Sequence, residues 1–87
     1  MRRAVLKTDA AINSRAKTIY FKLKAGSART SFVRAEKAWL SYRRASCAAQ
    51  ASVYAGGSLQ PVAYARCEAN RNQRHLGDLS QLLRALR

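Results

Sequence analysis

The sequence contains few of the residues that form turns, large cores or acidic surfaces. Its 87 residues include one proline, four glycines and only 8% aromatic residues. So few turn-forming residues argue against a β-protein with many strands. Four acidic residues stand against 17 lysines and arginines, which gives a formal charge of +13. A chain of this length allows a single small domain, residues 1–87, and its thin, alanine-rich core leaves the oligomeric state open.

Long apolar runs are also absent. No stretch approaches the roughly 18 residues that a membrane span needs. The basic start, Met1 to Arg3, is followed by only three apolar residues, whereas a secretory signal needs about 7–15. We therefore expect either a cytoplasmic protein or the mature or shortened form of an exported one.

Apolar side chains recur at helical spacing in a first stretch, about residues 3–24. Ile12, Ile19 and Leu23 illustrate the steps of three and four positions that place side chains on one face of a helix. A turn at Ala25, Gly26 and Ser27 ends this stretch. Gly26 suits the left-handed position that often follows the last turn of a helix.

Two further helices are predicted over about residues 28–55 and 60–86. The turn between them holds Gly56 and Gly57, and Pro61 suits the first turn of the following helix. Gly77 is a weak point at which the last helix could bend. The sequence thus predicts an all-α domain of three helices.

The second and third predicted helices fold back on each other about Gly57. Cys47 and Cys67 each lie ten residues from Gly57, so a straight antiparallel hairpin places them at the same height. The same hairpin brings Trp39 beside His75, which supports the pairing of these helices. The two cysteines favour a disulfide, worth about 3 kcal/mol for a loop of about 20 residues. Two buried free thiols are the alternative.

No arrangement of residues suggests catalysis, a cofactor or a metal site. His75 is the sole histidine, and the spacing of the two cysteines does not match metal binding. The four acidic residues are too few for a convincing acid–base pair. The Gly-Gly-Ser turn lacks the lysine of a phosphate-binding loop. We therefore expect a non-enzymatic protein that needs no cofactor or metal.

The segment from Trp39 to Arg43 combines aromatic and basic side chains. The simplest interpretation places Trp39 in the core, Tyr42 half-buried, and the aliphatic stem of Arg43 over the seam between helices. Any carboxylate near Arg43 then forms a structural ion pair. The alternative interpretation places Tyr42 and Arg43 on a face that binds a partner.

The basic residues are scattered over all three predicted helices and form no continuous block. The sequence shows none of the common nucleic-acid-binding motifs. A surface with a charge of +13 still binds polyanions without sequence preference and loses affinity steeply with salt. Binding to nucleic acid or to anionic surfaces is therefore one functional hypothesis.

A run of motifs resembles the LprI-type lysozyme inhibitors, a family of small bacterial cell-envelope domains. The shared pattern is W-x-x-Y-R-x-x-x-C, then a Gly-Gly-Ser turn and a second cysteine, preceded by D-x-x-L-N with Ile in place of Leu. The resemblance covers about residues 9–83. The motif residues are Asp9, Ile12, Asn13, Trp39, Tyr42, Arg43, Gly56, Gly57 and Ser58, together with Cys47 and Cys67.

This resemblance implies a helical, exported domain, periplasmic or secreted, whose two cysteines pair. It also implies binding to lysozyme or to another envelope protein, by steric occlusion from a rigid scaffold. The candidate contact residues are Tyr42, Arg43, Gly57, Ser58 and Leu59. The last three form an exposed turn that could enter a cleft, the alternative being a turn that only connects two helices.

The sequence also departs from the family pattern. Family members usually begin with a signal peptide and a further segment with another cysteine pair, so we expect an N-terminally shortened form or a remnant without the family's role. Asn72 and His75 stand where the family has a threonine and an arginine. Animal lysozymes are basic as a class, so a protein with a charge of +13 is repelled by them at long range.

Overall fold

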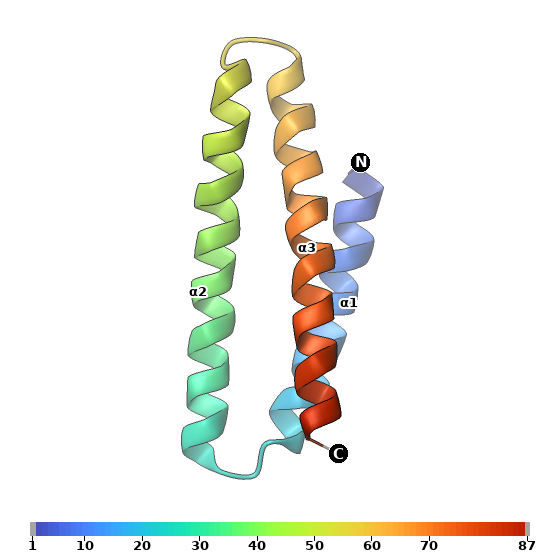
Figure 1. The fold of residues 1–87 in the computed structure, drawn as a ribbon, viewed down its shortest axis with the longest axis vertical. Coiled ribbons are helices and arrows are strands. Elements are labelled where there is room, and N and C mark those ends of the chain that lie inside the picture. Colours follow the sequence, from blue (N-terminus) through green and yellow to red (C-terminus); the bar gives the residue numbers. More distant parts are fainter. Residues whose placement is uncertain (1, 87) are drawn as a thin grey trace.

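The computed structural model describes residues 2–86 and consists of three long helices (Figure 1). They are α1 (Arg2–Lys22), α2 (Gly26–Ala51) and α3 (Leu59–Ala85), with a 3₁₀ turn, η1 (Ser52–Tyr54), after α2. The three predicted helices are confirmed, and the described residues include no strand. None of the described helices carries an apolar window long enough to cross a bilayer.

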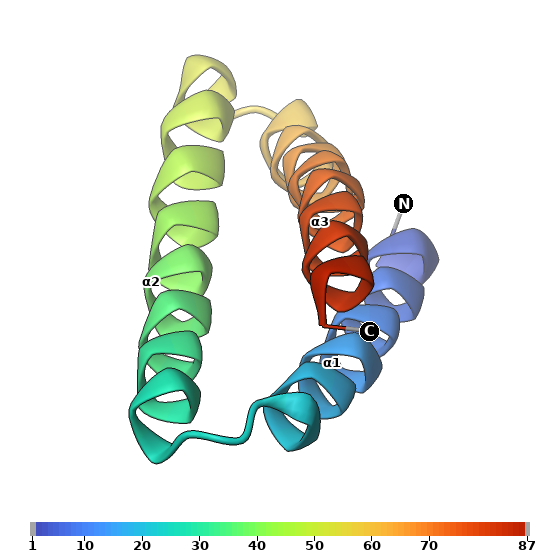
Figure 2. The same cartoon turned by 60° about the horizontal axis from the view of Figure 1, so that its bottom comes forward.

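The three helices form an elongated molecule that measures 48 × 21 × 15 Å. α2 and α3 make the predicted antiparallel hairpin, and α1 runs alongside α3 in the same direction (Figures 1 and 2). α1 packs extensively on α3 and only sparsely on α2. The central helix of the arrangement is therefore α3, which contacts both of the others.

The apolar core lies along the seam between α1 and α3. Its buried members are Ile12 and Ile19 of α1 and Leu76 and Leu79 of α3. Ile12 and Ile19 lie on one face of α1, and Leu76 and Leu79 lie on one face of α3. These two faces pack against each other. α2 contributes only half-buried side chains to this core, and its own buried residues are Cys47 and Ala51. Discrete contacts, rather than a continuous apolar stripe, therefore hold α2 in place.

The corner between α1 and α2 is closed by an arginine. The Nε of Arg29 donates hydrogen bonds to the carbonyl oxygens of Tyr20 and Leu23, at 3.0 and 2.8 Å. These carbonyls end α1 and have no partner within the helix. Gly26 begins α2 and has no positive φ, so the predicted left-handed position for it is wrong. The side chain of Arg29 therefore provides hydrogen bonds to the terminal carbonyl oxygens, which a left-handed glycine makes possible at other helix ends.

The hairpin turn needs its first glycine. Gly56 has a φ of 81°, and it is the one residue with positive φ among those the structure describes. The next amide, that of Gly57, donates to the carbonyl oxygen of Tyr54 at 3.0 Å and tightens the turn. Pro61 lies in the first turn of α3, as predicted, whereas Gly77 leaves α3 unbroken.

We expect opposite effects from alanine at two of the glycines. Gly56→Ala should lower the free energy of unfolding by about 1 kcal/mol, because an L-residue is strained at positive φ. Gly77→Ala should raise it by about 0.5–1 kcal/mol, because Gly77 lies within a helix and a Cβ there meets open space. Urea unfolding followed by circular dichroism measures both changes. Unchanged stability of Gly56→Ala would contradict this account of the turn, and a loss of stability in Gly77→Ala would contradict the open space at that position of α3.

Candidate functional site

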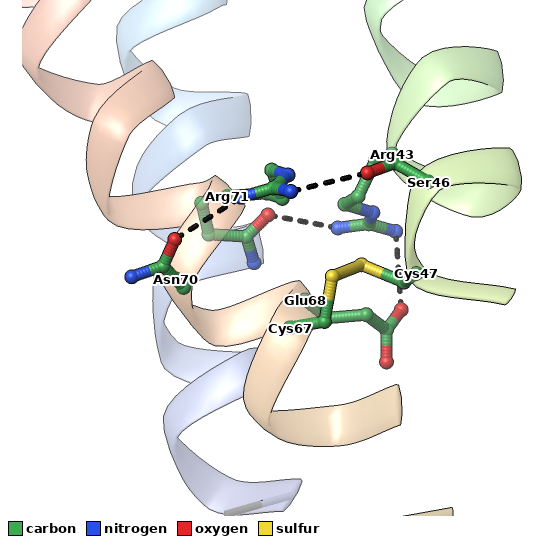
Figure 3. Close-up of a disulfide and its surroundings, with 8 residues drawn as sticks. Arg43, Ser46, Cys47, Cys67, Glu68, Asn70 and Arg71 are labelled. Carbon is green, nitrogen blue, oxygen red and sulfur yellow. Dashed lines mark hydrogen bonds and ion pairs between the residues drawn. A yellow bond between two sulfur atoms is a disulfide. The ribbon is translucent and has the colours of Figure 1, made fainter. Parts of the chain in front are cut away.

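The three helices meet at a polar cluster around Arg43, which we call the polar seam: Thr8, Asp9, Arg43, Glu68 and Asn72. Arg43 extends from α2 toward α3, and its side chain is only 14% exposed. Its Nη1 donates to Asp9 of α1 at 2.7 Å and to Asn72 of α3 at 2.9 Å. Its Nη2 lies 3.6 Å from a carboxylate oxygen of Glu68 (Figure 3). One guanidinium therefore joins all three helices.

Asn72 completes the polar seam from the side of α3. It is fully buried, yet both ends of its amide have partners. Its Oδ1 accepts from Arg43, while its Nδ2 donates to the hydroxyl of Thr8 at 2.9 Å and to Asp9 at 3.0 Å. The Thr8 hydroxyl in turn donates to the carbonyl oxygen of Ala4 at 2.7 Å. Buried polar groups with partners of this kind fix one register between helices.

An aromatic stack lies one helical turn further along the same seam. The rings of Trp39 and His75 lie face to face, with centroids 3.8 Å apart and planes 9° from parallel. The Nε2 of His75 lies 2.9 Å from a carboxylate oxygen of Glu36. Arg43 also lies over the Trp39 ring, with its guanidinium carbon 5.5 Å from the ring centroid. The predicted contact between Trp39 and His75 is thus present.

The disulfide lies on the other side of Arg43, toward the hairpin turn (Figure 3). Cys47 and Cys67 form the predicted bridge, and their Cα atoms are 5.4 Å apart. Both residues are buried. The bridge, the polar seam and the aromatic stack therefore follow one another along the contact between α2 and α3.

The chemistry of this region is that of a packed interface. Asp9, Glu36 and Glu68 are three of the four acidic residues in the chain, and each faces a basic side chain across the seam. The pairs of Arg43 with Asp9 and Glu68 are the structural ion pairs that the simpler interpretation of Arg43 predicts. Among the described residues, no group of three or more side chains is placed to hold a metal ion.

The hairpin turn presents a different surface, which we call the tip: residues 53–62. Val53 and Leu59 are 79% and 57% exposed, and Tyr54 and Val62 are also exposed. The tip lies within a longer stretch, residues 45–65, that contains no charged side chain at all. In a chain with a charge of +13, this end of the hairpin is neutral and apolar.

An apolar groove of about 950 Å³ adjoins the tip. It lies between the first turns of α1, the end of α2 and the first turns of α3. The groove combines small and branched apolar side chains with Arg2 and Glu68 at its border. Its main apolar lining residues are Val5, Leu6, Ala48, Ala51, Pro61 and Val62. The tip and this groove together place exposed apolar side chains next to an apolar hollow.

The structure does not bring the five candidate contact residues together. Gly57, Ser58 and Leu59 are exposed at the tip. Tyr42 is exposed on α2, about 20 Å further along the helix axis, so the predicted half-burial of Tyr42 is wrong. Arg43 is enclosed by its ion pairs within the polar seam. The tip is therefore the place where predicted contact residues cluster on an accessible surface.

The motif residues divide in the same way. Asp9, Trp39 and Arg43 converge where the three helices meet, and Ile12 belongs to the apolar core. Asn13 is exposed on α1. Most of the pattern therefore specifies how the helices pack.

The sequence did not predict that two members of the polar seam, Thr8 and Asn72, hold the helices together. Thr8 and Asn72 are polar, so neither stands out in an apolar pattern. The available signal was their spacing, because Thr8 lies four positions before Ile12 and Asn72 four positions before Leu76, on the same helix faces. In this structure Asn72 accepts a hydrogen bond from Arg43.

Comparison with known proteins identifies the family. A family model described as "Lysozyme inhibitor LprI" matches residues 1–79. No curated protein and no solved structure gives a significant match. The family match covers all three helices as far as Leu79, including the polar seam, the disulfide and the tip. The chain belongs to the LprI family of lysozyme inhibitors.

Proposed function

We propose that this protein binds a lysozyme-class enzyme and blocks its substrate cleft sterically, without catalysing a reaction. The contact surface is the tip, with Gly57, Ser58 and Leu59 entering the cleft. The observation that carries this proposal is the neutral, apolar tip at the end of a cross-linked hairpin. Family membership supplies the class of partner.

The exposure of the tip supports a role in binding. Val53, Leu59 and Val62 expose apolar side chains next to an apolar groove. Contiguous apolar surface of this kind on a small soluble protein marks a site of interaction. Apolar and aromatic side chains, such as Tyr54, also dominate the energetic centres of protein interfaces.

The distribution of charge reduces the electrostatic repulsion between the tip and a basic lysozyme. A basic lysozyme and a protein with a charge of +13 repel each other at long range. Along the hairpin, however, the charged residues nearest the turn are Arg44 and Arg66, about 13 Å or more from Gly57 along the helix axes. The Debye length at physiological ionic strength is about 8 Å. The repulsion that Arg44 and Arg66 exert on a partner in contact with Gly57 is therefore largely screened.

The interior of the hairpin supports the same function. The disulfide and, further from the tip, the hydrogen bond from Arg43 to Asn72 hold α2 against α3. A loop that is rigid before binding loses less conformational entropy when it enters a cleft. A disulfide also forms and persists in an oxidising compartment, which fits a periplasmic or secreted location.

The test is lysis of bacterial cell walls by an animal lysozyme, followed as loss of turbidity. The protein at equimolar concentration should slow lysis. Leu59→Lys places a charge at the tip and should weaken inhibition by about tenfold, because a buried unpaired charge is costly and a basic partner repels it.

Leu40→Lys is the matched control. Leu40 is exposed on α2, away from the tip, and the change alters net charge by the same amount. This variant should inhibit as well as the parent protein. Undiminished lysis at large molar excess of the parent protein would overturn the proposal, and equal losses in the two variants would remove the tip as the contact surface.

A further inference from the structure

A second groove, of about 540 Å³, runs along the hairpin from the edge of the tip. It is formed by α2, η1 and α3, with no residue from α1. One wall carries Gln50, Val53 and Tyr54. The other wall carries three arginines and an asparagine of α3: Arg66, Asn70, Arg71 and Arg74. We call this feature the arginine groove.

The polar side chains of the arginine groove follow one line along α3. Arg66, Asn70 and Arg74 are spaced four residues apart, so they lie on the same face of the helix and span about 12 Å of its axis. All three are exposed. The row therefore presents two guanidinium groups and one amide to the solvent in sequence.

Arg71 lies deeper in the groove, and hydrogen bonds hold it in place. Its guanidinium donates to the hydroxyl of Ser46 on α2 at 3.1 Å and to Oδ1 of Asn70 at 3.2 Å (Figure 3). Its guanidinium carbon also lies 5.9 Å from the centroid of the Tyr42 ring. These partners are all neutral, so they leave the positive charge of Arg71 uncompensated.

No carboxylate among the described residues pairs with the three arginines. Asp9 and Glu68 pair with Arg43, and the carboxylate of Glu36 faces His75. Three of the four acidic residues therefore contact side chains other than these arginines. The arginine groove keeps three positive charges for an external ligand.

We propose that the arginine groove binds a linear polyanion through its phosphate groups. Arginine offers paired donors that match phosphate oxygens. A straight row of donors along one helix fits an extended chain of phosphates better than a single compact anion. Tyr54 at the end of the groove adds an aromatic surface beside the chain. The groove shares Val53 and Tyr54 with the tip, but its arginines lie outside the segment Gly57–Leu59 that is proposed to enter the lysozyme cleft. The proposal does not depend on binding to lysozyme.

The experiment uses fluorescence anisotropy with a labelled oligothymidylate, and inorganic polyphosphate as the competitor. The parent protein should bind the oligonucleotide in about 50 mM salt and lose affinity as salt rises. Polyphosphate, which has no bases, should displace it. The double variant Arg66→Gln/Arg74→Gln should bind about tenfold more weakly, and its salt slope should fall by about 1.4, since each contact contributes about 0.7 on a single strand.

The matched control is Arg34→Gln/Arg84→Gln. Both of these arginines are exposed and lie outside the arginine groove, and the variant loses the same two charges. It should bind within about threefold of the parent protein, because only the general attraction falls. Circular dichroism checks that both variants remain helical.

Three results would overturn the proposal. Equal weakening in the two double variants would show diffuse attraction without a site. Failure of polyphosphate to displace the oligonucleotide would exclude recognition through phosphate alone. Tighter binding to vesicles of anionic phospholipid than to either polymer, lost in Arg66→Gln/Arg74→Gln, would assign the groove to a membrane surface instead.

Discussion

Replacing Arg43 by glutamine should destabilise the protein by about 2–3 kcal/mol. The change removes one cation that pairs with Asp9 and Glu68, so two carboxylates and the Oδ1 of Asn72 lose their shared partner. Breaking a fully buried ion pair costs about 3–5 kcal/mol, and Asp9 is 36% exposed, which lowers the cost here. For a domain of this size, the melting temperature should fall by on the order of 15 °C.

The neighbouring arginine provides the control. Arg44 is exposed, so Arg44→Gln makes the same change in charge without touching the polar seam and should shift stability by less than about 0.5 kcal/mol. A second test removes the other partner. Asp9→Asn combined with Arg43→Gln should cost less than the sum of the single changes, because the two side chains form one unit. Thermal unfolding measures all four proteins, and equal stability of the Arg43 and Arg44 variants would contradict a structural role for the ion pairs.

The parts of the fold that depend on local signals could be predicted from the sequence. Helical periodicity and two glycine-containing turns defined the three helices. The hairpin followed from symmetry about Gly57, which places Cys47 opposite Cys67 and Trp39 opposite His75. Both contacts are present, since two straight helices joined by a short turn have only one register.

The position of α1 and the members of the polar seam could not be predicted in the same way. An apolar stripe such as that of Ile12 and Ile19 can pack against either of two other helices. The choice depends on long-range contacts, including the hydrogen bonds from Asn72 to Thr8 and Asp9. Buried polar residues give no signal in an apolar pattern.

The end of α1 was misjudged for a related reason. The partner of its last carbonyls is Arg29, a side chain that belongs to the next helix. A glycine at the corner was the expected local solution. Arg29 reaches these carbonyl oxygens only because α2 packs against the end of α1. A side chain of the next helix therefore takes the place of the expected glycine.

In the candidate site, too, the local sequence predicts the exposure of some residues, whereas long-range contacts decide the position of others. Leu59 could be identified as exposed because it follows directly after a Gly-Gly-Ser turn. Arg43 belongs to a motif and carries a charge, so its sequence properties fit either a binding face or an interior ion pair. The structure places it in the interior, which leaves the tip as the accessible candidate surface.

The second large effect is expected from removal of the disulfide. α2 buries only Cys47 and Ala51, so it depends on the bridge more than α1 or α3 does. The double variant Cys47→Ala/Cys67→Ala should lose about 3 kcal/mol of stability, the value for a closed loop of this size. That is a large share of the 5 kcal/mol or so that a small domain has in total.

Hydrogen exchange distinguishes where the loss occurs. Without the bridge, amides of α2 should exchange faster than those of α3, because α3 still packs on α1 through Leu76 and Leu79. Reduction of the parent protein should reproduce the change, and the same reductant should leave the double variant unaffected. If the amides of α2 did not exchange faster after reduction, the polar seam and the aromatic stack would be sufficient to hold the hairpin closed. The tip would then keep its rigid support even in a reducing compartment.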